Sequence, residues 1–117
     1  MKKSITLLFF MLISISLLAQ NKNTKVADKL FDRFEFVQAA QEYLLLVEKG
    51  NKEGYICKQL GDCYFNMYNT VEAEKWYELA VKSKQDSETY FRYAQMLKSN
   101  GKYEESNVQM KTFASLS

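Results

Sequence analysis

The side chains best able to do chemistry in this 117-residue chain are two cysteines and fourteen carboxylates, because it contains no histidine. Two cysteines without histidine cannot complete a closed tetrahedral zinc site, so we expect no metal site. Cys57 and Cys63 are six positions apart in one predicted helix, which separates them by about 9 Å along its axis. That separation exceeds the roughly 7 Å limit for a disulfide. We therefore expect two unpaired, buried cysteines that act as small apolar residues.

Catalysis by the carboxylates is not expected either. An active site needs a nucleophile, a base and an orienting group, and the usual base is histidine. The four glycines form no clustered phosphate-binding loop. Several carboxylates have the spacing of solvent-facing helix positions or stand at helix starts, where they favour the helix dipole: Asp28, Asp32, Glu72, Glu74, Glu104 and Glu105. We predict a non-enzymatic protein that needs no cofactor.

The elements that would position these side chains repeat along the chain. The clearest copy spans residues 60–80 and reads Leu-Gly-x-x-Tyr, a break at Tyr68-Asn69, and Ala-x-x-x-Tyr-x-x-Ala. A shift of 33 residues gives a related copy at 93–113, and a shift back by 34 gives another at 26–46. Each copy therefore predicts two helices joined by a tight turn.

Small residues in this pattern predict where two helix backbones approach closely. They fall at matching positions of the first helices and of the second helices: Ala27, Gly61 and Ala94, then Ala39, Ala73 and Ser106. Gly50 and Gly101 suit helix ends that need a left-handed residue, and Asn69 with Glu72 resembles a helix cap. The predicted helices span residues 24–34, 36–49, 53–67, 70–83, 87–99 and 103–115.

This pattern resembles the tetratricopeptide repeat (TPR), a helical hairpin of 34 residues. The resemblance covers residues 21–117 and implies an all-α solenoid of three helical hairpins, with repeats at about 20–53, 54–86 and 87–117. Gln85 stands where the family commonly has proline, so we expect a looser connection there. The resemblance implies an architecture and no particular chemistry.

Residues 1–20 have the pattern of a secretory signal peptide. A basic start, Met1-Lys2-Lys3, precedes an apolar run over residues 5–18 and the small residue Ala19. The alternative is a membrane anchor, but about 14 apolar residues fall short of the roughly 20 that span a bilayer. Export to the periplasm is therefore expected.

Removing the two lysines of the signal peptide leaves 14 basic and 14 acidic residues, which argues against nucleic-acid binding.

The TPR resemblance also implies where a protein or peptide partner would bind. The first helices of stacked hairpins line a concave groove that suits an extended peptide or a helix. Carrying over the inner positions gives thirteen residues, of which eight are the candidates for binding: Phe31, Tyr55, Lys58, Phe65, Asn66, Phe91, Gln95 and Lys98. Each aromatic ring could anchor a partner in one shared groove or pack against the neighbouring repeat. Clamping of a terminal carboxylate is not expected, because Asp62 follows Lys58 and Glu88 stands where a basic residue is needed.

A narrower resemblance concerns the bacterial envelope. Residues 26–50, 73–81 and 90–106 look like the N-terminal TPR segment of OmpA-like envelope proteins, which continue into a β-propeller and a peptidoglycan-binding domain. The resemblance implies a periplasmic scaffold whose partner is another envelope protein, with outer-membrane or cell-wall association only through domains absent from this chain. The last predicted helix presents Met110, Phe113, Ala114 and Leu116 to a missing neighbour, so we expect more protein to follow. A stand-alone adaptor and a glycan or small-ligand binder are the alternatives.

Overall fold

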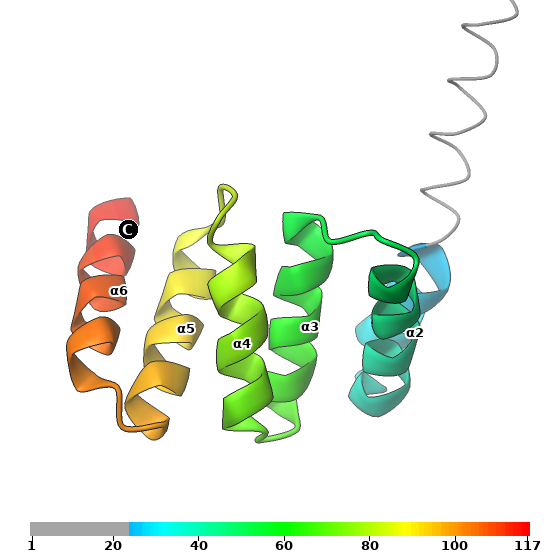
Figure 1. Ribbon diagram of the computed structural model, residues 1–117, viewed down its shortest axis with the longest axis horizontal. Helices are drawn as coiled ribbons and strands as arrows, with labels where there is room; N and C mark the ends of the chain where they lie inside the picture. The colour runs from blue at the N-terminus through cyan, green and yellow to red at the C-terminus, as the bar shows by residue number, and fades with distance from the viewer. Residues whose placement is uncertain (1–23) are drawn as a thin grey trace, which may run out of the picture.

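The computed structural model describes residues 24–117, which form a row of helical hairpins (Figure 1). A helical segment over residues 24–32 is followed by α2 (Phe36–Glu48), α3 (Gly54–Asn66), α4 (Thr70–Ala80), α5 (Ser87–Ser99) and α6 (Tyr103–Leu116). The described part of the chain has no strand. The predicted all-α solenoid of three helical hairpins is thus confirmed, whereas the predicted signal peptide lies outside the described residues.

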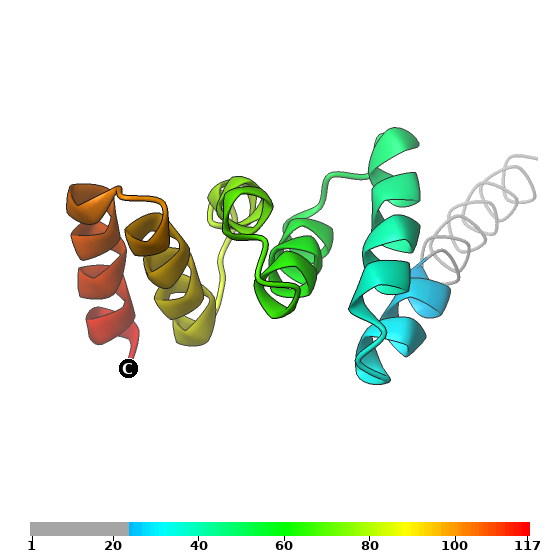
Figure 2. The same cartoon turned by 90° about the horizontal axis from the view of Figure 1, so that it is seen from below.

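The order of the hairpins in space follows their order in the chain (Figures 1 and 2). Each of α2 to α5 packs against the helix that follows it, and α3 also contacts α5. The first helices of successive hairpins are therefore neighbours, and residues about 34 positions apart come together on one surface. Between residues 24 and 117, no helix is both long enough and apolar enough to cross a bilayer.

Small side chains let the two helices of each hairpin pack closely, as the sequence predicts. All six predicted small residues are buried. A Cβ atom on Gly61 would lie 2.5 Å from Cδ1 of Tyr77, so only glycine fits where α3 meets α4. In the last hairpin the hydroxyl of Ser106 donates a hydrogen bond of 2.7 Å to the carbonyl oxygen of Ala94. Cys57 and Cys63 are buried and unpaired, as expected.

The turns inside the hairpins hold two features that the sequence did not reveal. Gly101 has the expected positive φ of 83°, but Phe34 and Tyr68, at the matching positions of the first two hairpins, have φ of 62° and 59°. A left-handed conformation is unfavourable for aromatic residues, at a cost of roughly 1–2 kcal/mol each. Both rings are highly exposed, at 77% for Phe34 and 90% for Tyr68. The turns therefore hold two aromatic rings out toward solvent.

The connection between the second and third hairpins is tied down. The side-chain amide of Gln85 donates hydrogen bonds to the carbonyl oxygens of Gly54, at 3.3 Å, and Ala80, at 3.1 Å. The prediction of a looser connection at this position was wrong, because the amide replaces the rigidity of a proline ring with two hydrogen bonds across the loop. Asp86 then caps α5 by accepting a hydrogen bond of 3.0 Å from the backbone N–H of Thr89.

Candidate partner-binding site

A pair of an aspartate and a tyrosine, 15 residues apart, recurs in the first two hairpins. The hydroxyl of Tyr43 donates a hydrogen bond to Asp28, and that of Tyr77 donates to Asp62 at 2.5 Å. The next hairpin then adds a donor to each pair. The amide of Gln59 donates to the hydroxyl of Tyr43 at 3.0 Å, and Arg92 lies 3.0 Å from the carboxylate of Asp62. The pairs therefore link each hairpin to its successor.

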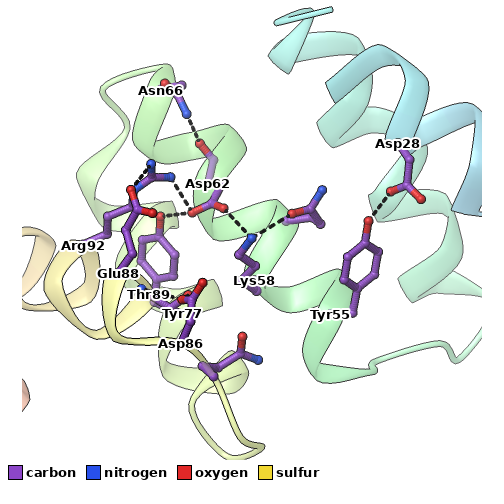
Figure 3. A network of polar contacts seen from close by, with 12 residues as sticks. Asp28, Tyr55, Lys58, Asp62, Asn66, Tyr77, Asp86, Glu88, Thr89 and Arg92 are labelled. Atoms are coloured by element: carbon purple, nitrogen blue, oxygen red, sulfur yellow. Dashed lines mark hydrogen bonds and ion pairs between the residues drawn. The ribbon is translucent and has the colours of Figure 1, made fainter. Parts of the chain in front are cut away.

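Asp62 is the centre of the second link and is only 3% exposed (Figure 3). Besides Tyr77 and Arg92, its carboxylate meets Nζ of Lys58 at 3.3 Å. The guanidinium of Arg92 also pairs with Glu88 at 2.8 Å. Burial, followed by the charge of Asp62, raises the pKa of the Tyr77 phenol. A charged network thus joins α3, α4 and α5.

Two carboxylates that the sequence places on a solvated face are internal instead. Glu74 is only 8% exposed, and it accepts hydrogen bonds from Lys102 at 2.7 Å and Asn100 at 3.1 Å. Asp28 is half-buried between Tyr43 and Tyr55, whose hydroxyl donates to it at 2.7 Å. The expectation of solvent exposure was wrong at Glu74 and holds only in part at Asp28, because the facing partners come from helices that helical periodicity alone does not place.

A cavity of about 280 Å³ lies where the segment 24–32, α3 and α5 converge. One wall is aromatic: the rings of Phe31 and Phe36 meet edge to face at 5.4 Å between centroids, and those of Phe34 and Phe36 are 6.0 Å apart. The other wall is polar and charged, and consists of Lys58, Asp62, Asn66, Asp86, Glu88, Thr89 and Arg92. We call this space the three-hairpin cavity, because every hairpin supplies part of its lining.

The structure divides the eight candidate residues among several places. Phe31, Lys58 and Asn66 line the three-hairpin cavity. Phe91, Gln95 and Lys98 line a second cavity of about 520 Å³ between α5 and α6. Phe31 and Phe91 therefore line different cavities.

The remaining two candidates take part in contacts within the solenoid. Tyr55 is 46% exposed and donates its hydroxyl to Asp28, and the partial burial of its phenol, followed by this hydrogen bond, raises its pKa to about 12. The ring of Phe65 lies 5.0 Å below the guanidinium of Arg92. Phe65 therefore follows the second alternative, in which the ring packs against the neighbouring repeat.

Five lining residues of the three-hairpin cavity escaped the sequence analysis: Phe34, Phe36, Asp86, Thr89 and Arg92. Phe34 was assigned to the end of the first predicted helix and Phe36 to the second helix of its hairpin, and the other three were assigned to no inner position. A left-handed turn redirects the Phe34 side chain in a way that helical periodicity does not describe. The recurring separation of 15 residues could have marked Asp62 and Tyr77 as a pair, but it does not indicate Arg92 as their partner.

The outer side of α6 lacks the cover that α2 and α4 receive from the next hairpin. Asn107, Met110 and Ala114 are exposed, whereas Tyr43 and Tyr77, at the positions that match Met110, are fully buried. Leu116 is exposed as well. Phe113 differs from the prediction, because its ring packs on Phe91 within its own hairpin at 5.1 Å.

No metal centre is evident among residues 24–117, where no group of three or more cysteine, aspartate or glutamate side chains is placed to hold an ion. The titratable side chains of the three-hairpin cavity are engaged with each other. Lys58 and Arg92 share Asp62, and Asp86 accepts hydrogen bonds from the backbone N–H and the hydroxyl of Thr89. The arrangement suits recognition of a ligand better than proton transfer.

Comparison with known proteins agrees with this architecture. No protein-family model and no curated protein matches the chain. Among solved structures, it is similar to the C-terminal part of a TPR repeat-containing protein from Cytophaga hutchinsonii, with a TM-score of 0.73 and 21% sequence identity. The fold is TPR-like. The match covers 80% of this chain and 38% of that structure, so this chain spans less than half of it, and at this identity the likeness shows the fold alone.

Proposed function

We propose that this protein is a non-catalytic scaffold that binds a segment of another protein in the three-hairpin cavity. The observation that carries this proposal is the shared lining, because the cavity exists only when all three hairpins are stacked. Its volume of about 280 Å³ suits one or two side chains of a peptide, and lies just below the range for small-molecule sites. Exposed aromatic rings beside polar groups are the features that anchor peptide segments.

We further propose a periplasmic location and an envelope protein as the partner. The support is the signal-peptide pattern of residues 1–20 and the sequence resemblance to the N-terminal TPR segment of OmpA-like envelope proteins. Contact with the outer membrane or cell wall would then come from domains outside residues 1–117. Fusion of residues 1–30 to a reporter enzyme that is active only in the periplasm tests the location, and a fusion without activity would contradict it.

Two matched substitutions in the hairpin turns test the binding site. Phe34→Asn removes a ring from the cavity wall, whereas Tyr68→Asn removes a ring at the matching turn outside the cavity. Asparagine tolerates a left-handed backbone, so both variants should remain folded. Peptides selected from a random library displayed on phage, with residues 21–117 as bait, provide the ligands.

We expect Phe34→Asn to weaken binding of the selected peptides about tenfold, consistent with a ring at the centre of an interface. Tyr68→Asn should leave their affinity within about twofold. Dissociation constants would be measured by fluorescence polarisation, and circular dichroism would show whether the helices are intact. Equal effects of the two substitutions, or a selection that enriches no peptide, would contradict the proposal.

A further inference from the structure

We propose that the three-hairpin cavity receives a basic side chain, lysine or arginine, from the bound segment. This inference rests on the proposed function and specifies its partner chemistry. It follows from the juxtaposition of three phenylalanine rings on one wall with acidic side chains on the other.

The charges of the cavity favour a cation. Its lining contains two basic side chains, Lys58 and Arg92, and three acidic ones, Asp62, Asp86 and Glu88. The local balance is therefore negative by one charge. Opposite charges across an interface determine which partners are accepted more than they determine affinity.

Both basic side chains are already paired inside the protein. Lys58 lies 3.3 Å from Asp62, and Arg92 lies 3.0 Å from Asp62 and 2.8 Å from Glu88. An incoming carboxylate would have to break one of these pairs and would approach Asp86 as well. The positive end of the α5 helix dipole is likewise occupied, because Asp86 and Glu88 already stand at its start. An acidic ligand would therefore meet only cations that are already paired with carboxylates of the cavity.

Glu88 is the acidic side chain most accessible to a ligand. Its side chain is 66% exposed, and its carboxylate contacts Arg92 through Oε1 at 2.8 Å. An ionised carboxylate offers about four acceptor positions, so one contact leaves capacity for a further donor. Asp86 stands two residues earlier on the same rim and is also exposed. A lysine or arginine head group placed there would meet two carboxylates.

The aromatic wall completes a site for a long basic side chain. The aliphatic part of lysine or arginine packs well against apolar surface, and its charged head is attracted to ring faces. Phe31, Phe34 and Phe36 supply these rings. The protein already contains such an arrangement, because Arg92 lies 5.0 Å from the Phe65 ring centre while it pairs with Asp62.

The test compares Glu88→Lys with Glu104→Lys in selections from one random dodecapeptide library. Both glutamates are exposed and lie in the first turn of a helix, but only Glu88 lines the cavity. Peptides enriched on the wild-type domain should contain an excess of lysine and arginine over acidic residues. Glu104→Lys should retain this excess, and Glu88→Lys should abolish it.

A solution measurement then isolates the basic side chain. Replacing the enriched lysine or arginine of the best peptide by glutamine should weaken its binding about tenfold, and Glu88→Gln should weaken the original peptide about threefold. Enriched peptides without a basic excess, or an excess that survives Glu88→Lys, would overturn the inference while leaving the proposed function intact. A library without any enriched peptide would overturn both.

Discussion

Replacing Asp62 by alanine would remove the acceptor at the centre of the charged network. Three donors from three helices meet this carboxylate: the hydroxyl of Tyr77 at 2.5 Å, Arg92 at 3.0 Å and Lys58 at 3.3 Å. The first donor is fully buried, so it cannot turn to water when its acceptor is lost. The two cations are partly exposed and can recover some hydration.

The expected loss of stability follows from these three partners. Breaking a buried ion pair from one side costs about 3–5 kcal/mol, and an orphaned buried hydroxyl costs about 1–3 kcal/mol. Because Lys58 and Arg92 reach solvent, losing their ion pairs with Asp62 should cost well below the value for a fully buried pair. We therefore expect Asp62→Ala to lower the free energy of unfolding by about 3 kcal/mol. Tyr77→Phe, which removes one donor and leaves both ion pairs, should cost about 1 kcal/mol.

Urea unfolding followed by circular dichroism measures both values, with Asp32→Ala as the control. Asp32 is an exposed aspartate on the first helical segment, so its removal should change stability by less than about 0.5 kcal/mol. The double variant Asp62→Ala, Tyr77→Phe should cost less than the sum of the single changes, because the hydroxyl is no longer orphaned. A cost for Asp62→Ala below about 1 kcal/mol, or strict additivity, would refute the network as described.

Three further predictions concern the acid end of the pH range, the close helix contact and the cysteines. Hydrogen bonds from Thr89 lower the pKa of Asp86, so the stability that Asp86 contributes is present above its ordinary value of 3.8 and lost as the pH falls below it. Asp86→Ser keeps a capping hydroxyl without a charge, so the variant should lose less stability than the wild type between neutral and acidic pH. Urea unfolding midpoints at the two pH values measure this loss, and an equal loss in both proteins would contradict the prediction. Gly61→Ala should destabilise by about 1–3 kcal/mol in thermal unfolding, because its Cβ would press on the Tyr77 ring, and an unchanged midpoint would show that the helices can separate freely. Burial raises the pKa of the Cys63 thiol to about 12, so a thiol reagent should modify Cys63 quickly only in denaturant. Fast modification of Cys63 in the folded protein would contradict the burial of this side chain.

The sequence predicts much of this fold because the information lies in short-range spacing. Residues three and four apart define each helix stripe, and the small residues Gly61, Ala73 and Ala94 mark the close contacts. All three are buried where the pattern expects them. The helix boundaries also agree to within three residues, since glycines and capping side chains end or begin helices through local hydrogen bonds.

The proposed binding site was less predictable because it depends on contacts between hairpins. Asp62 in α3 pairs with Arg92 in α5, which stands thirty residues later in the chain. Phe34 reaches the cavity from a left-handed turn, where helical periodicity gives no direction for the side chain. The groove residues carried over from the TPR resemblance describe a regular repeat. This chain departs from regularity where Gln95 and Met110 replace the aspartate and tyrosine of the first two hairpins.

The central claim is that a peptide segment enters the three-hairpin cavity beside Phe34. Photocrosslinking tests it most directly, with benzoylphenylalanine placed at position 34 in one sample and at position 68 in another. Both positions carry highly exposed aromatic rings in matching turns, so the two samples differ in their distance from the cavity and little else. The account predicts that a library-selected peptide becomes covalently attached from position 34 and not from position 68. Attachment from position 68 alone, or equal attachment from both, would contradict it.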